Sequence, residues 1–280
     1  MTYRMLIFVV MKRDTHRPLI LVTNDDGLGA PGLRALLEVV RPLGEVWVVV
    51  PAEPHSGMSH AITVAKPVRL TYHDNRSGEG YRCFSVTGTP VDCVKLAINR
   101  LLPRRPDLLV SGINHGSNAS VNLIYSGTMG AALEGALNGI RSVGLSLLDP
   151  DPTADMGEAQ RIAGLILRHV LENGYHPALC LNVNIPAGHS VRGIRVCRQA
   201  HGYWTEEFEE VTTGDGQTAY LLRGTYHNLE PEATDTDEWI LRHGYAAIVP
   251  VHTDHTRYDD IPLLDDLNIE LVSNKTFQQK

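Results

Sequence analysis

The apolar residues of this chain fall into short continuous runs that alternate with stretches of helical periodicity. The first run, LILVT at 19–23, precedes a helical pattern over 31–40 and a second run, EVWVVV, at 45–50. Short apolar runs bounded by turn residues predict buried strands, and their alternation with helical segments predicts βαβ units. We therefore expect the chain to begin a parallel sheet.

The alternation continues through the middle of the chain, after a hairpin-like pair of strands at 68–72 and 81–86. Helical and strand patterns then take turns at 90–101, 107–110, 127–138, 143–147, 155–172 and 179–185. This order predicts an α/β fold with three layers, in which a mostly parallel sheet is covered by helices on both faces.

The pattern changes at Gly193, where strand and turn signals replace the helical stretches. An acidic stretch lies at 205–210, and a short helix is predicted near 235–243. We expect three parts: an N-terminal extension over 1–17, a catalytic core over 18–192, and a smaller C-terminal lobe of strands and hairpins over 193–280. Alternatively, Met11 is the true start of the chain.

Composition narrows the class of protein. A content of 43% hydrophobic and 20% charged residues provides a core and does not match the composition of disordered chains. The net charge is −7, and no basic run is longer than a pair such as Arg104-Arg105. The sequence therefore has no basic stripe that could neutralise many phosphates. We expect no long nucleic-acid partner, although a small anion needs only a local site.

The cysteines and the N-terminal apolar stretch indicate a cellular compartment. The four cysteines show no C-x-x-C spacing, which favours free thiols in a reducing cytoplasm. The apolar stretch at 5–11 is far shorter than a membrane span and lacks a cleavage pattern. We expect a cytoplasmic protein that does not contact a membrane.

Four polar segments follow predicted strands or open a predicted helix: NDDG at 24–27, PAEPHSGMSH at 51–60, SGINHGSN at 111–118 and YSGTMG at 125–130. Each has a purely structural alternative, namely an Asx-type turn, a solvated loop, a glycine-rich turn and a helix N-cap. Ligands of open α/β sheets, however, lie beyond the carboxyl ends of the strands. We therefore expect the four segments to meet at one edge of the sheet.

The side chains that would meet there are suited to a divalent cation. Adjacent Asp25 and Asp26 would repel each other unless a cation or proton lay between them. With Ser56 and Asn114 they offer only oxygen ligands, which favours Mg²⁺, Mn²⁺ or Ca²⁺ over zinc. Two carboxylates would offset the charge of the ion without repelling a phosphate, which suits phosphomonoester hydrolysis.

Two other functions compete for the same segment. Gly27, Gly29 and Gly32 form a G-x-G-x-x-G pattern between strand and helix, with Glu53 near the distance of a ribose-binding acid, which predicts an NAD-binding oxidoreductase. The adjacent aspartates would place negative charge beside the pyrophosphate and so oppose that interpretation. A phosphorylatable, Mg-binding switch module is the other alternative, but such modules are usually much shorter.

Five ordered motifs resemble the SurE (survival protein E) family: LVTNDDG at 21–27, HSGMSHAIT at 55–63, TGTPVDCVKLA at 87–97, SGINHGSN at 111–118 and YSGTMGAALEGA at 125–136. Members of this family are metal-dependent 5'- and 3'-nucleotidases. The resemblance extends from about Leu19 to the segment at 235–251. It implies a Rossmann-like core and a homodimer or homotetramer whose C-terminal parts exchange between subunits.

The resemblance also implies how the site works on nucleoside monophosphates and other small phosphomonoesters. It assigns one divalent cation per subunit, Mg²⁺ or Mn²⁺, to Asp25, Asp26, Ser56 and Asn114. Phosphate contacts are expected from Ser56, Gly57, Asn114, Ser126, Gly127 and Thr128. Our catalytic hypothesis is in-line attack by water, with Asp25 or Asp26 accepting its proton, and no serine nucleophile because no G-x-S-x-G elbow is present.

Histidines and aromatic residues supply weaker candidates. His60 and His115 flank the expected site and could donate to phosphate or to the leaving oxygen, although loop histidines are often plain polar residues. His201, Tyr203 and Trp204 could stack on a nucleobase, although aromatic residues in a lobe more often pack it. Because the other candidates address metal and phosphate, we expect only a modest preference among bases.

Overall fold

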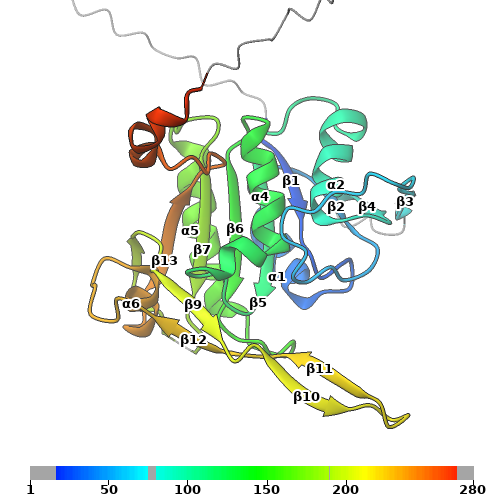
Figure 1. Ribbon diagram of the computed structural model, residues 1–280. Helices are drawn as coiled ribbons and strands as arrows, with labels where there is room; N and C mark the ends of the chain where they lie inside the picture. Colours follow the sequence, from blue (N-terminus) through cyan, green and yellow to red (C-terminus); the bar gives the residue numbers. More distant parts are fainter. Residues whose placement is uncertain (1–16, 75–79, 189, 270–280) are drawn as a thin grey trace, which may run out of the picture.

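A computed structural model describes residues 17–74, 80–188 and 190–269. Within this part of the chain, the main sheet contains β1 (Leu19–Thr23), β2 (Glu45–Pro51), β3 (Leu70–Tyr72), β4 (Tyr81–Val86), β5 (Leu108–His115), β6 (Ser142–Leu147), β7 (Cys180–Ile185), β8 (Ile194–Val196) and β13 (Ala246–Val251). Their order is β3-β4-β2-β1-β5-β6-β7-β13-β8, and only the β3–β4 and β7–β13 pairs are antiparallel (Figure 1).

Helices cover both faces of this sheet. On one face α1 (Pro31–Val40) packs against α5 (Gly157–Glu172), and their apolar sides join the strands in one core. On the other face α2 (Pro90–Leu96) packs against α4 (Gly127–Leu137) over a second core. The predicted three-layer α/β fold is thus confirmed.

The central strands and the helix starts follow from local chemistry. The residues Leu19–Val22 have no exposed surface, as expected for a parallel strand that is covered on both faces. Helix α2 begins with a capping box in which Thr89 Oγ1 accepts from Asp92 N (3.1 Å) and Asp92 Oδ2 accepts from Thr89 N (2.9 Å).

Two predicted boundaries differ from the structure by more than two residues. The helix predicted over 90–101 is α-helical only to Leu96 and continues as a π-helical turn, η2 (Ala97–Leu101). The strand predicted to end at Val110 extends to His115, because β6 continues beside it after a register shift. Gly112 lies at this irregularity with φ +130°, so the glycine that suggested a turn in fact accommodates a bulge.

The C-terminal region adds both to the sheet and to a smaller lobe. Besides β8 and β13, it forms two antiparallel pairs, β9 (Gly202–Thr205) with β12 (Thr225–Asn228) and β10 (Phe208–Thr212) with β11 (Thr218–Leu222). The β10–β11 hairpin projects away from the body (Figure 1). The expected strand and hairpin lobe is confirmed. The boundaries at 17 and 192 stay predictions, and residues 1–16 lie outside the described residues.

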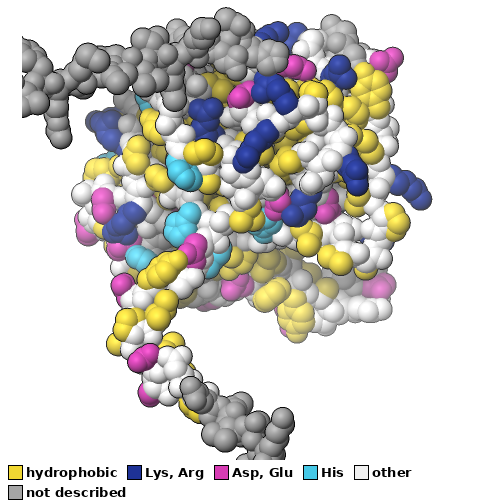
Figure 2. Space-filling model, turned by 90° about the horizontal axis from the view of Figure 1, so that it is seen from above, with side chains coloured by type: hydrophobic (Ala, Val, Ile, Leu, Met, Phe, Trp, Pro, Cys, Tyr) yellow, Lys and Arg dark blue, Asp and Glu magenta, His cyan; other side chains and the backbone are white. Residues whose placement is uncertain are grey.

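Three short helical segments complete the described chain: α3 (Asn122–Tyr125), α6 (Asp237–Arg242) and the 3₁₀ segment η3 (Tyr258–Leu267). None of the described helices is long and apolar enough to cross a membrane. On the face shown in Figure 2, Lys and Arg side chains are scattered singly among apolar and acidic ones and form no continuous stripe.

Candidate active site

The turn after β1 holds the two adjacent aspartates. Asn24 closes this turn, since its Nδ2 donates to Gly27 O (2.9 Å) and its Oδ1 accepts from Gly27 N (3.2 Å). Gly27 has φ +83°, a conformation that glycine adopts readily. The Asx-type turn weighed as a structural alternative therefore exists, and it also presents Asp25 and Asp26 at the edge of the sheet.

Asp25 is buried, and Asp26 is partly buried. Asp25 is only 4% exposed, and burial raises its pKa to about 6 despite the hydrogen bond that its Oδ1 accepts from Thr128 Oγ1 (2.5 Å). Repulsion from Asp26 raises this pKa further. Burial also raises the pKa of Asp26, while the nearby His115 opposes that rise. Desolvated, adjacent carboxylates of this kind are stabilised by a proton or a cation.

The loop after β2 brings Ser56 and Gly57 to the aspartates. His55 N donates to Asp25 O (2.7 Å), which ties the loop to the β1 turn. At its other end, Ser59 N donates to Tyr125 O (3.0 Å) and Ser59 Oγ donates to Ile124 O (2.6 Å). This loop, for which a solvated loop was the structural alternative, is therefore anchored on both sides of Ser56.

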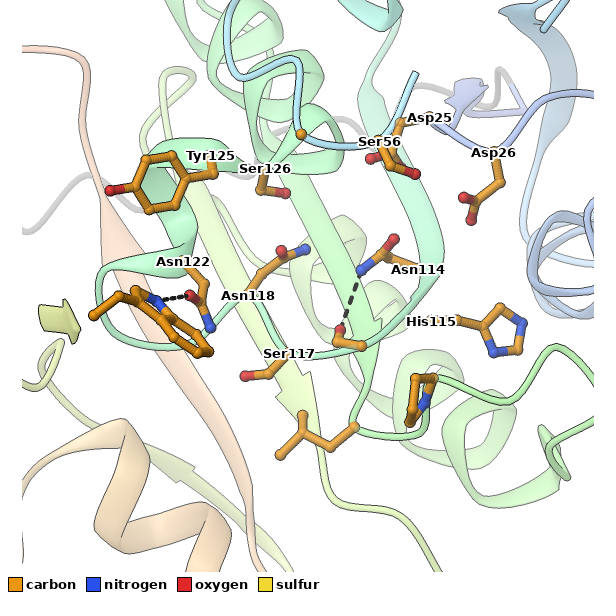
Figure 3. Close-up of a pocket in the computed structure, with 15 residues that line it drawn as sticks. Asp25, Asp26, Ser56, Asn114, His115, Ser117, Asn118, Asn122, Tyr125 and Ser126 are labelled. Atoms are coloured by element: carbon orange, nitrogen blue, oxygen red, sulfur yellow. Dashed lines mark hydrogen bonds between the residues drawn. The ribbon is translucent and has the colours of Figure 1, made fainter. Parts of the chain in front are cut away.

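Strand β5 supplies Asn114 and His115 at its carboxyl end. Asn114 Nδ2 donates to Gly116 O (3.1 Å), so its amide oxygen points toward Ser56 and Asp25, as Figure 3 shows. His115 Nδ1 lies 3.3 Å from Asp149 O. Its Nε2 is buried and has no hydrogen-bond partner among the described residues.

Helix α4 starts directly behind Asp25. Ser126 is its N-cap and accepts from Met129 N (3.0 Å). A side chain at Gly127 would lie 2.9 Å from Asp25 Oδ2, so only glycine allows the helix to approach the carboxylate this closely. The positive end of the helix thus faces an anionic site.

These segments surround one cavity of about 670 Å³, within the range of small-molecule sites. The predicted residues that line it are Asp25, Asp26, Ser56, Gly57, Asn114, His115 and Ser126. Gly127 and Thr128 do not line the cavity, because they lie buried against Asp25. His60 does not line it either, because its Nε2 contacts Glu134 Oε2 (3.1 Å) on α4.

The cavity also includes Gly116, Ser117, Asn118 and Tyr125, which lie in the selected segments but were not singled out. Asn122, Leu148 and Pro150 lie outside those segments. Leu148 and Pro150 follow β6 directly. Because ligands of open α/β sheets lie beyond the carboxyl ends of the strands, the end of β6 is the signal that predicts these two residues as part of the cavity. Trp204, weighed only as a base-stacking candidate, lines the same cavity.

The four candidate ligands fit a hard divalent cation. They comprise two carboxylates, a hydroxyl and an amide oxygen whose orientation is set by Gly116, which is the donor chemistry that Mg²⁺ and Mn²⁺ prefer. Among the described residues, no group of three or more His, Cys, Asp or Glu side chains is placed to hold a metal. Since the four candidate ligands offer only oxygen atoms, this set differs from the nitrogen- and sulfur-rich centres that bind zinc.

The glycine pattern has a structural explanation that does not involve a dinucleotide. Gly27 N is engaged by Asn24, and a side chain at Gly32 would collide with Ile113 O at 1.9 Å. A side chain at Gly29 would meet nothing within 4 Å. Turn geometry and helix packing thus account for Gly27 and Gly32, and the oxidoreductase alternative is not favoured.

The fold and the site together define an α/β protein with an oxygen-rich cavity at the carboxyl edge of a mostly parallel sheet, beside the start of α4. The family model described as Survival protein SurE matches residues 20–206. This chain belongs to the SurE family.

Named relatives match over nearly the whole chain. The 5'-nucleotidase SurE of Phocaeicola vulgatus is 44% identical over 261 residues, which cover 93% of this chain and 100% of that protein. The 5'-nucleotidase SurE of Christiangramia forsetii is 47% identical over 244 residues, which cover 86% of this chain and 94% of that protein. The crystal structure of the SurE protein from Aquifex aeolicus matches with a TM-score of 0.76 and 32% sequence identity. The match covers 89% of this chain and 99% of that structure's chain.

Proposed function

We propose that this chain is a metal-dependent nucleotidase that hydrolyses nucleoside 5'- and 3'-monophosphates to nucleoside and phosphate. The observation that carries the proposal is the meeting of two adjacent carboxylates, one buried and one partly buried, with Ser56 and Asn114 in one cavity beside the start of α4. The relatives named 5'-nucleotidase support the same activity.

Asp25, Asp26, Ser56 and Asn114 would hold the cation, which we propose to be Mg²⁺ or Mn²⁺. When bound, such a cation supplies charge neutralisation for the phosphate and Lewis-acid activation of the attacking water. The phosphate is bound and oriented by residues on the cavity wall: Ser56, Gly57, Asn114 and Ser126. Gly127 and Thr128 act on the phosphate from the start of α4, where they pack against Asp25.

The aspartates also handle the proton of the attacking water. A carboxylate oxygen of Asp25 or Asp26 accepts this proton, and Thr128 Oγ1 keeps the Asp25 side chain oriented. Because water attacks phosphorus directly, no phosphoenzyme forms. Trapping phosphoserine or aspartyl phosphate during turnover would contradict this mechanism.

We further propose that the chain forms a homodimer or homotetramer through its C-terminal region over 193–280. The projecting β10–β11 hairpin supports this, because Phe208, Tyr220 and Leu222 are exposed there. We place the protein in the cytoplasm, since Cys93 and Cys180 are free, buried thiols.

Metal dependence tests the proposed function. Protein stripped with a chelator should release no phosphate from 5'- or 3'-mononucleotides, and added Mg²⁺ or Mn²⁺ should restore release more effectively than Zn²⁺. Phosphate release that is unaffected by the chelator would contradict it. NAD binding without phosphatase activity would support the oxidoreductase instead.

A further inference from the structure

The cavity has an aromatic part as well as an acidic part. Asp26 and His115 lie on one side in Figure 3, while Asn122 and Tyr125 lie on the other. Trp204 contributes to the same wall as Asn122, because its Nε1 donates to Asn122 Oδ1 (2.9 Å). A ligand whose phosphate meets the aspartates can therefore extend toward an indole ring.

We propose that Trp204 is the stacking platform for the nucleobase, so that the enzyme selects nucleotides over phosphomonoesters without a base. This inference rests on the proposed function and adds a second recognition element to it. An aromatic ring accepts every base, because each base has a π face, and stacking on one contributes substantially to nucleotide binding. The ring thus reads the presence of a base and not its identity.

The indole is held in place before any ligand arrives. Its Nε1 is engaged by Asn122, and its ring packs against Tyr226 at a centroid distance of 5.7 Å and an interplanar angle of 58°. Tyr226 OH donates to Ser120 Oγ (2.5 Å). A preorganised ring loses little side-chain entropy when a base stacks on it.

The strand that carries Trp204 is also tied to the body of the protein. The carboxylate of Asp237, which has no exposed surface, accepts from Ser120 N (2.8 Å) and from Ala200 N (2.9 Å). Ser120 Oγ donates to Ala200 O (2.9 Å). These bonds connect the segment before β9 to the loop before Asn122, so the position of the indole is set by the same framework as the cavity wall.

The test compares two substrates that share a phosphate and differ in the base. Steady-state rates are measured with 5'-AMP and with ribose 5-phosphate for the wild type, Trp204→Ala and Trp204→Phe, each in Mn²⁺. Tyr203→Ala is the matched control, because Tyr203 is the neighbouring aromatic residue of β9, stacks on His227 and does not line the cavity.

We expect Trp204→Ala to raise KM for AMP by about 5- to 100-fold with little change in KM or kcat for ribose 5-phosphate. Trp204→Phe should lie between alanine and the wild type, and Tyr203→Ala should match the wild type. Unchanged activity on ribose 5-phosphate also shows that the variant is folded.

Two results would overturn the inference: a KM for AMP that does not change in Trp204→Ala, or an equal loss on both substrates in both Trp204 variants. The second result would mean that the ring is structural. A wild-type enzyme that hydrolyses neither substrate would instead contradict the proposed function, so the two failures are distinguishable.

Discussion

Glu134 of α4 joins the helix to the loop that carries Ser56, and its charge is expected to stabilise the fold. Its side chain is 4% exposed, whereas those of His60 and Lys95 are 33% and 45% exposed. Glu134 Oε2 contacts His60 Nε2 (3.1 Å), and Oε1 accepts from Lys95 Nζ (2.9 Å) and from Asn138 Nδ2 (2.9 Å). Glu134→Gln keeps the side-chain volume and removes the charge.

The magnitude follows from these contacts. A hydrogen bond to a charged group contributes about 1.5–3 kcal/mol, and we take the lower end for the His60 contact because that ring is partly exposed. The Lys95 pair is solvent-screened and contributes about 0–1 kcal/mol. Glu134→Gln should therefore lower the free energy of unfolding by about 1.5–2.5 kcal/mol near pH 7.

The pH dependence provides a sharper check. Burial by itself would raise the pKa of Glu134, but the bonds from His60, Lys95 and Asn138 outweigh it and lower the pKa below the ordinary 4.5. A carboxyl group whose pKa is lower in the folded than in the unfolded state stabilises the protein at pH values above its unfolded-state pKa. That stabilisation is lost as the pH falls through the folded-state pKa. The stability difference between wild type and Glu134→Gln should thus shrink below about pH 4.5.

Chemical denaturation of both proteins from about pH 7 to about pH 3.5 measures this difference. Glu172→Gln is the matched control, because it removes an exposed carboxylate from α5 and should have a small effect at every pH. A Glu134→Gln variant as stable as wild type at pH 7, or a stability difference that does not vary with pH, would refute the reasoning.

Two further predictions concern packing and substrate choice. Gly130→Ala would place a methyl group 2.2 Å from Ser59 O, so it should lower stability by about 1–3 kcal/mol in thermal denaturation, whereas Gly29→Ala, which meets nothing within 4 Å, should be neutral. Equal melting temperatures for the two variants would contradict this packing. Among the four common ribonucleotides, each as 5' and 3' isomers, kcat/KM should vary modestly, and discrimination approaching about 10⁴-fold would refute recognition by phosphate and stacking.

The sheet was largely predictable because strands such as β1 and β2 are apolar at nearly every position. Burial on both faces leaves no alternation of polar residues in LILVT or EVWVVV, so these runs stand out from the helical stretches. Strand order was not predictable, because periodicity carries no information on neighbours. The antiparallel insertion of β13 between β7 and β8 depends on long-range pairing alone.

The acidic part of the candidate site was predictable for a topological reason. Asp25, Ser56 and Asn114 each follow or end a parallel strand, and the carboxyl ends of such strands share one edge. The extension of β5 through Gly112 was missed, because a glycine-rich segment favours a turn unless a neighbouring strand pairs with it.

The position of His60 could not be read from the sequence either. Its partner Glu134 lies 74 residues away on α4, where a glutamate among small apolar residues gives no sign of a buried ionic contact. A glutamate in a helix is usually expected to face the solvent, since acidic residues are rarely buried without a partner.

Direct cation binding tests the central claim, namely that the carboxylate pair and its two polar neighbours hold a divalent ion. Metal-stripped protein is titrated with Mn²⁺, and free Mn²⁺ is quantified by its paramagnetic resonance signal for wild type, Asp26→Asn and Glu53→Gln. Glu53 is an exposed acid after β2 that does not line the cavity, so its variant should bind as wild type does. We predict one ion per chain in the wild type and binding weaker by about tenfold or more in Asp26→Asn. Equal Mn²⁺ affinity in Asp26→Asn and the wild type would contradict the account.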